Sequence, residues 1–131
     1  MSAFQEYFDA SHQLVRDSVR RFVEREILPH IDDWEEAEEF PRELYLKAGA
    51  AGILGIGYPE QFGGSHEGDV FAKVAASEEL MRSGSGGLVA GLGSLDIGLP
   101  PIVKWARPQV RDRVAPQVLA GEKIMALAVT E

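Results

Sequence analysis

The segment that decides the fold class is Lys123-Ile124-Met125-Ala126-Leu127-Ala128-Val129-Thr130-Glu131. Its apolar residues follow one another without a turn signal, which is typical of a buried β-strand. A lone strand cannot pair its own backbone N–H and C=O groups, so this one needs neighbouring strands that the rest of the sequence does not supply. We therefore expect the chain to be the front part of a longer protein, with residues 123–131 as the first strand of a further, truncated β-domain.

Residues 1–122 show the apolar spacing of a helical domain. The first helix is expected to begin near Asp9 or Ser11, either of which can act as its N-cap, and to end or bend at Pro29. Ile31 and Trp34 indicate that the chain then continues to pack along the core. Further helices are predicted over residues 41–51, 69–82, 88–106 and 109–119. The fold class predicted is all-α, an orthogonally packed domain of about five to six helices with a C-terminal β-strand stub.

Two of these helices carry more detailed predictions. The residues of 69–82 expected to face the core are Val70, Phe71, Val74, Ala75, Leu80 and Met81. The helix over 88–106 is apolar on nearly all sides, which implies burial on every face or a ligand lying against one of them. Pro100 and Pro101 are expected to divide this helix into two pieces, and Gly121 is expected to close the helix over 109–119.

Composition narrows the class of protein. The chain has 131 residues, room for one compact domain, and its formal net charge of −8 argues against a nucleic-acid partner. The absence of cysteine excludes disulfides, thiolate metal sites and cysteine nucleophiles. The first residues lack the basic start and apolar core of a signal peptide, and we expect no membrane span. The predicted location is cytoplasmic.

Motifs that carry chemistry by themselves are weak in this sequence. Gly55-Ile56-Gly57 lacks the third glycine of a dinucleotide-binding loop and the lysine of a P-loop, so close packing is the better interpretation. His12, His30 and His66 are widely separated, which predicts surface or internally satisfied histidines and no metal site. The residues alone thus indicate a helical domain that leads into a sheet.

Several segments, taken together and in order, resemble the acyl-CoA dehydrogenases. The segments that carry the resemblance are Phe40-Pro41-Arg42-Glu43-Leu44, the glycine-rich stretch over 52–64, Glu78-Glu79-Leu80-Met81-Arg82-Ser83-Gly84, Leu99-Pro100-Pro101-Ile102 and the stretch over 121–131. The resemblance implies an N-terminal helical domain over 1–122, followed at 123–131 by the first strand of the family's middle β-domain. It also implies a C-terminal four-helix domain, with FAD lying between the middle and C-terminal domains.

The reaction that the resemblance implies is α,β-dehydrogenation of an acyl-CoA thioester. A glutamate removes the α-proton, the flavin accepts the β-hydride, and an electron-transfer flavoprotein reoxidises the flavin. The implied partners are therefore an acyl-CoA substrate, an electron-transfer flavoprotein and further copies of the chain in a homo-oligomer.

Site residues follow from the same resemblance. Those implied to contact FAD are Leu127, Ala128, Val129, Thr130 and Glu131, and those implied to line the acyl-tail pocket are Ala90, Leu92 and Leu95. No catalytic residue is assigned, because the family's catalytic glutamate belongs to a region beyond the matched segments. We expect the chain alone to be inactive and to hold FAD weakly or not at all.

Two alternatives remain open at this point. One is a related flavoenzyme, such as an acyl-CoA oxidase or a flavin monooxygenase. The other, from a different class, is a non-catalytic helical interaction module left by a truncated or split gene. In either case the apolar side chains of Leu127 and Val129 predict self-association, which could proceed through the edge of the terminal strand.

Overall fold

The computed structural model describes residues 4–129, and seven α-helices make up most of this range. They are α1 (Ala10–Phe22), α2 (Ile31–Ala37), α3 (Glu43–Ala50), α4 (Val70–Leu80), α5 (Gly86–Leu92), α6 (Leu95–Trp105) and α7 (Pro108–Leu119). A π-helical turn, Val23–Ile27, extends α1, and short 3-10 helices lie at Gln5–Tyr7, Glu60–Phe62 and Met81–Ser83. Within the described range, β-structure is limited to one isolated bridge between Ile56 and Ser65. The all-α prediction is confirmed.

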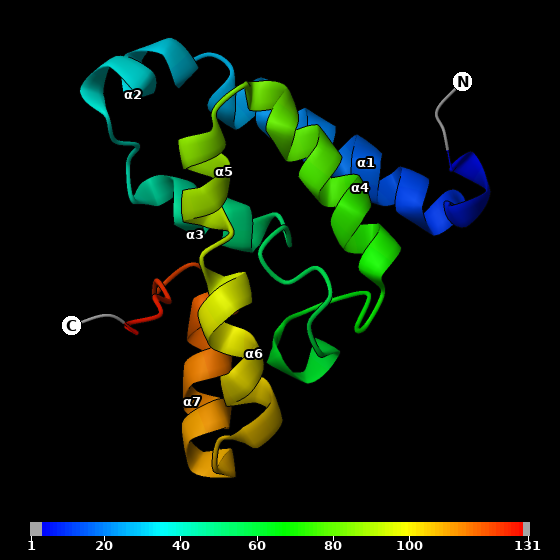
Figure 1. The fold of residues 1–131 in the computed structure, drawn as a ribbon, viewed down its shortest axis with the longest axis vertical. Helices are drawn as coiled ribbons and strands as arrows, with labels where there is room; N and C mark the ends of the chain where they lie inside the picture. The colour runs from blue at the N-terminus through cyan, green and yellow to red at the C-terminus, as the bar shows by residue number, and fades with distance from the viewer. Residues whose placement is uncertain (1–3, 130–131) are drawn as a thin grey trace.

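The helices form two pairs joined by a middle region (Figure 1). α1 and α4 lie side by side at one end of the molecule, and α6 and α7 pack together at the other. Between the pairs lie α3, α5 and the glycine-rich loop, whose buried side chains include Ile53, Leu54 and Ile56. One continuous apolar core links these parts, with Ile31 and Trp34 of α2 packed against its margin as predicted.

The starts of α1 and α4 are both capped by aspartates. The Asp9 carboxylate accepts the N–H groups of Ser11 and His12, and the His12 ring accepts the Asp9 N–H in return at 2.9 Å, which completes a capping box. Asp69 caps α4 by accepting the N–H groups of Phe71 and Ala72. His12 Nε2 lies 2.8 Å from Asp69 Oδ2, so one buried histidine joins the two caps. This confirms that His12 is internally satisfied.

The buried face of α4 differs from the prediction. Ala75 is buried and Leu80 is half-buried as expected, but four of the residues expected to face inward are exposed: Val70, Phe71, Val74 and Met81. The residues that α4 buries are instead Ala72, Ala75, Ala76 and Glu79. Small side chains let two helix axes approach closely, so α4 packs on α1 through its alanines and leaves its larger apolar side chains outside.

The break in the long apolar stretch also differs from the prediction. The chain divides at Gly93 and Ser94, between α5 and α6, while Pro100 and Pro101 lie inside α6. Proline fixes φ near a helical value, about −65°, but inside a helix each ring removes an N–H donor and crowds the carbonyl four residues earlier. α6 therefore continues in spite of its two prolines. At Gly93 the backbone has a φ of −85° and a ψ of 0°, and α5 ends there.

The same stretch bears on membrane insertion. Gly86–Trp105 is long and apolar enough to cross a bilayer by length and composition, contrary to the expectation that no such segment exists. In the structure it forms two helices of 7 and 11 residues, each shorter than the ~20 residues that a membrane span requires. Leu88, Leu92, Leu95 and Leu99 are buried in the protein core. These helices bury one face only, because Ala90, Ile97 and Trp105 are exposed, so the expected burial on every face is not observed.

The segment after α7 leaves the helical domain along α6. Gly121 ends α7 with a φ of 76°, which confirms its predicted role. Arg42 donates a hydrogen bond to the Glu122 carbonyl at 2.7 Å, and Met125 packs into the space left by Gly98. Residues 123–129 form neither a helix nor a strand, and Leu127 and Val129 are exposed. The strand over 123–131 therefore stays a prediction, with Thr130 and Glu131 outside the described residues.

Candidate functional site

A narrow apolar cavity of about 80 Å³ lies between α4, the α5–α6 junction and the glycine-rich loop. Its apolar lining consists of Ile53, Leu54, Ile56, Ala76, Leu80, Val89, Leu92, Gly93 and Leu95. Two of the three predicted acyl-pocket residues, Leu92 and Leu95, are thus brought together, both almost fully buried. The third, Ala90, is exposed and does not line this cavity. Leu92 and Leu95 belong both to the hydrophobic core and to the lining of this cavity.

A polar cluster lies beside this apolar lining. The Tyr58 hydroxyl donates to Asp96 Oδ1 at 2.8 Å, and Lys73 Nζ donates to the same oxygen at 2.5 Å. The Lys73 ammonium also lies 4.7 Å from the centre of the Tyr58 ring. Gly57 makes this possible, because a Cβ there would lie 2.8 Å from Lys73 Cδ. Sequence reasoning missed the cluster, since its members come from three separate segments with no shared spacing.

The Tyr58 cluster leads to a prediction for alkaline pH. Burial raises the pKa of the Tyr58 phenol, and the Asp96 carboxylate raises it further. The folded state therefore keeps the phenol proton, so this contribution to stability is complete below the ordinary pKa of 10.0 and is lost as the pH rises above it. Tyr58→Phe should cost about 1 kcal/mol of unfolding free energy at pH 7, and the difference from wild type should narrow above pH 10. Urea unfolding at pH 7 and pH 10.5 measures both.

A surface control is available for this measurement. Tyr7 is half exposed, so Tyr7→Phe removes a phenol without removing the bond to Asp96. An unchanged difference between wild type and Tyr58→Phe across this pH range would contradict the assignment of the raised pKa to the buried cluster.

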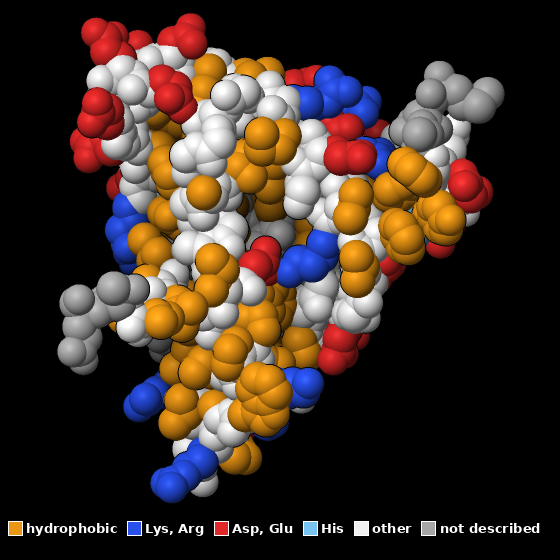
Figure 2. Space-filling view, viewed as in Figure 1, with side chains coloured by type: hydrophobic (Ala, Val, Ile, Leu, Met, Phe, Trp, Pro, Cys, Tyr) orange, Lys and Arg blue, Asp and Glu red, His pale blue; other side chains and the backbone are white. Residues whose placement is uncertain are grey.

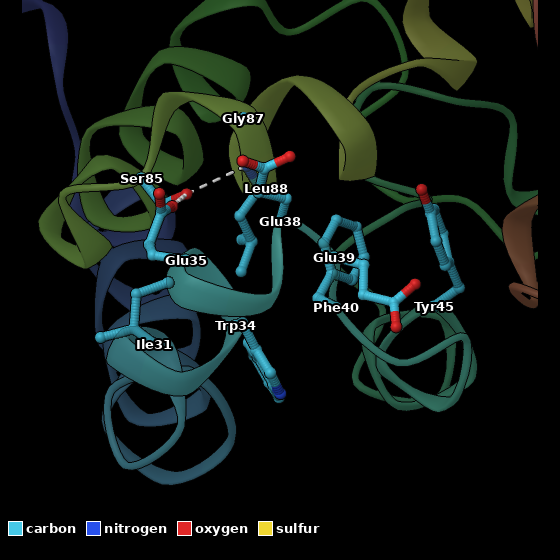
Figure 3. A pocket seen from close by; sticks show the side chains of 10 residues that line it. All are labelled: Ile31, Trp34, Glu35, Glu38, Glu39, Phe40, Tyr45, Ser85, Gly87 and Leu88. Atoms are coloured by element: carbon cyan, nitrogen blue, oxygen red, sulfur yellow. Dashed lines mark hydrogen bonds between the residues drawn. The ribbon is translucent and has the colours of Figure 1, made fainter.

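A second, larger groove of about 470 Å³ lies between α2, α3 and the start of α5 (Figure 3). Its walls combine the aromatic side chains of Trp34, Phe40 and Tyr45 with the carboxylates of Glu35, Glu38 and Glu39. The remaining lining residues are Ile31, Ser85, Gly87 and Leu88, so the described lining contains no lysine or arginine. The Ser85 hydroxyl donates to Glu35, which fixes that carboxylate at the groove's edge. This groove was not predicted, because α2 was not predicted as a helix.

The predicted flavin-contacting residues lie apart from both hollows. Leu127, Ala128 and Val129 are exposed, and they line neither the apolar cavity nor the groove. Within the described range they offer a single open edge, and no second wall is formed against it. The residues present therefore do not make a complete site for FAD. Over residues 4–129, no three His, Asp or Glu side chains come together as metal ligands.

The comparisons with known proteins define the class. The family model described as acyl-CoA dehydrogenase, N-terminal domain, matches residues 9–122. The chain is 38% identical over 124 residues to the mouse long-chain specific acyl-CoA dehydrogenase, which it covers over 28% of that protein's length. It is 32% identical to the caffeyl-CoA reductase–Etf complex subunit of Acetobacterium woodii, covering 33% of it.

Solved structures give the same answer. An acyl-CoA dehydrogenase structure from Mycobacterium smegmatis matches 92% of this chain and 32% of its own, with 40% identity and a TM-score of 0.83. An acyl-CoA dehydrogenase of Bacillus anthracis complexed with FAD matches 92% of this chain and 21% of its own, with 28% identity and a TM-score of 0.80. The chain belongs to the acyl-CoA dehydrogenase family and corresponds to its N-terminal helical domain. It spans a third or less of the length of these relatives.

Proposed function

We propose that this chain supplies the helical wall of the acyl-tail site in an FAD-dependent acyl-CoA dehydrogenase. The observation that carries the proposal is the apolar cavity containing Leu92 and Leu95, in a chain whose residues 9–122 match the family's N-terminal domain. Such a cavity favours an alkyl chain, because each methylene moved from water into an apolar site contributes about 0.8 kcal/mol. The bound flavin would supply the redox chemistry, while this chain would exclude water from the tail and position it.

The proposed assignments for the individual residues are these. Leu92 and Leu95 would contact the end of the acyl tail, and Ala90, on the exposed face of α5, would contact a more outward part of it. Residues 127–131 would form one edge of the flavin site, completed by parts of the protein outside this chain. Support for both assignments comes from the family resemblance and from the exposure of Ala90 and of residues 127–129.

The catalytic base is proposed to lie outside this chain. Its most buried glutamate, Glu79, is held by arginines, which lower the pKa of its carboxyl group and keep it charged. The Glu79 carboxylate is therefore poorly suited to take up a substrate proton. We propose that an electron-transfer flavoprotein accepts the electrons and that the complete protein is a cytoplasmic homo-oligomer. The name of the Acetobacterium relative places that protein in a complex with Etf.

The proposal is tested by acyl-chain dependence of binding to the purified chain. Isothermal titration should show palmitoyl-CoA binding at least about tenfold more tightly than free CoA. Ser77→Leu, at the cavity wall on α4, should remove most of that difference. Ser18→Leu on α1 is the matched control, because Ser18 is exposed and does not line this cavity.

Equal binding of CoA and palmitoyl-CoA would overturn the proposal, as would equal losses in the two leucine variants. A separate measurement addresses activity. The purified chain should neither retain stoichiometric FAD, read as flavin absorbance, nor reduce a dye with acyl-CoA. A yellow chain would show that it holds FAD by itself, and reduction of the dye would show that it also contains the catalytic base.

A further inference from the structure

One pole of the molecule is strongly acidic. Residues 32–39 contain six carboxylates and no lysine or arginine, and they form α2 and the turn that follows it. Glu35, Glu38 and Glu39 face the aromatic groove described above, which we call the acidic groove. Aromatic faces beside carboxylates are well suited to bind a segment that carries an aromatic side chain and a cationic one. The acidic groove thus has the chemistry to receive a basic, aromatic-bearing segment.

The opposite pole carries the complementary chemistry. The turn between α6 and α7 presents Lys104, Trp105 and Arg107, all exposed, and we call these three residues the basic corner. Trp105 is 72% exposed, which is unusual for so large an apolar side chain. The Lys104 ammonium lies 4.8 Å from the centre of its ring. Residues 104–113 hold four basic residues and one acidic one.

The two poles cannot meet within one molecule. α2 and the α6–α7 turn lie at opposite ends of its longest axis (Figure 1), and acidic and basic side chains gather at those ends (Figure 2). Because the poles are unlike surfaces, each contact between copies brings the groove of one copy to the corner of another. Such contacts produce rings or chains when each pair of copies makes one of them, and an antiparallel dimer when each pair makes two.

We propose that the basic corner of one copy docks into the acidic groove of a second copy. Trp105 lies against the faces of Trp34, Phe40 and Tyr45, while Lys104 and Arg107 pair with Glu38 and Glu39. Burial of the exposed indole supplies apolar area, and the charges fix orientation and register. This inference goes beyond the proposed function and does not depend on the reaction.

The test is a pair of charge-reversal variants studied by sedimentation velocity over a range of concentrations at 0.15 M salt, where charges interact only over about 8 Å. The groove variant is Glu38→Lys with Glu39→Lys, and the corner variant is Lys104→Glu with Arg107→Glu. Each variant alone should self-associate at least about tenfold more weakly than wild type. The two mixed together should recover association, because each then offers the other a complementary pole.

The groove variant separates specific docking from general repulsion. It moves the net charge from −8 toward zero, so repulsion alone would predict stronger association, whereas docking predicts loss. Control variants with matched charge changes elsewhere are Glu60→Lys with Glu67→Lys, and Arg21→Glu with Arg25→Glu, all at exposed positions. Mixing the two controls should give no complex beyond that of wild type.

A final variant separates the indole from the charges. Trp105→Ser keeps all charges and should weaken association about tenfold, since it removes the central aromatic contact. The proposal is overturned if wild type stays monomeric at every concentration, or if association survives both reversals. It is equally overturned if association is lost on changing Leu127 and Val129 to lysine but not on changing the poles.

Discussion

Gly121→Ala is expected to lower the free energy of unfolding by about 3 kcal/mol or more. Gly121 has a φ of 76°, in the left-handed region that L side chains rarely adopt. A Cβ at this position would also overlap the Tyr45 carbonyl group on α3. Because the overlapping atoms are backbone, relief requires the end of α7 to move away from α3. Urea unfolding of the variant followed by far-UV circular dichroism measures the loss.

Two other glycines separate the contributions to this effect. Gly52 also has a positive φ, 77°, but a Cβ there meets nothing within 4 Å, so Gly52→Ala measures the backbone cost alone. Gly87 lies in the first turn of α5 with neither constraint, and Gly87→Ala should be neutral or slightly stabilising. The ordering should be Gly121, then Gly52, then Gly87. If Gly121→Ala costs no more than Gly52→Ala, the close packing of α7 on α3 is wrong.

Glu79→Gln is expected to lower the free energy of unfolding by about 3 kcal/mol. It removes a buried carboxylate on α4 that pairs with arginines from two other helices. Arg20 donates to Glu79 Oε1 at 2.8 Å and to Oε2 at 3.1 Å, and Arg82 Nε lies 2.7 Å from Oε2. Glutamine keeps the shape of the side chain but leaves the guanidinium groups facing one another. The exposed Glu78, which pairs with Arg16, is the control, and Glu78→Gln should cost less than about 1 kcal/mol.

The effect of Glu79 has a definite pH dependence. Hydrogen bonding from Arg20 lowers the pKa of the Glu79 carboxyl below its ordinary value of 4.5. The contribution is therefore complete above pH 4.5 and is lost as the pH falls through the lowered pKa of the folded state. The advantage of wild type over Glu79→Gln should stay constant from pH 7 to pH 4.5 and decline below pH 4.5, measured by urea midpoints from pH 7 to pH 3. A constant difference would show that charge plays no part in it.

The sequence indicates most of this fold because helix starts and helix ends carry local chemistry. Asp9, one of the two predicted N-caps of α1, and Gly121 act as predicted, since a cap depends only on its own few residues. α2 was not predicted because none of its residues is fully buried, so its sequence lacks a clear apolar stripe. The prediction for the inward face of α4 was wrong because hydrophobic spacing identifies large residues, whereas α4 contacts α1 through alanines.

The site is less predictable for a different reason. Leu92 and Leu95 line an apolar cavity, and their role in an acyl-tail site stays a prediction. Tyr58, Lys73 and Asp96 come together only after the loop, α4 and α6 have packed. No spacing along the chain predicts that these three side chains lie close together. Ala90 and the segment 127–129 lie on the surface, so their assignments still depend on resemblance and on the binding experiments.

The pairing of α1 with α4 has a consequence for the rate of folding. It joins residues 57 and 59 positions apart, His12 to Asp69 and Arg20 to Glu79, whereas α6 and α7 are joined by two residues. The helical hairpin of α6 and α7 can therefore form early, while α1 must find α4 across a long intervening loop. Although every regular element between residues 4 and 129 is helical, the slow step of folding is then this distant docking. The time to reach the native state is set by topology more than by helix formation.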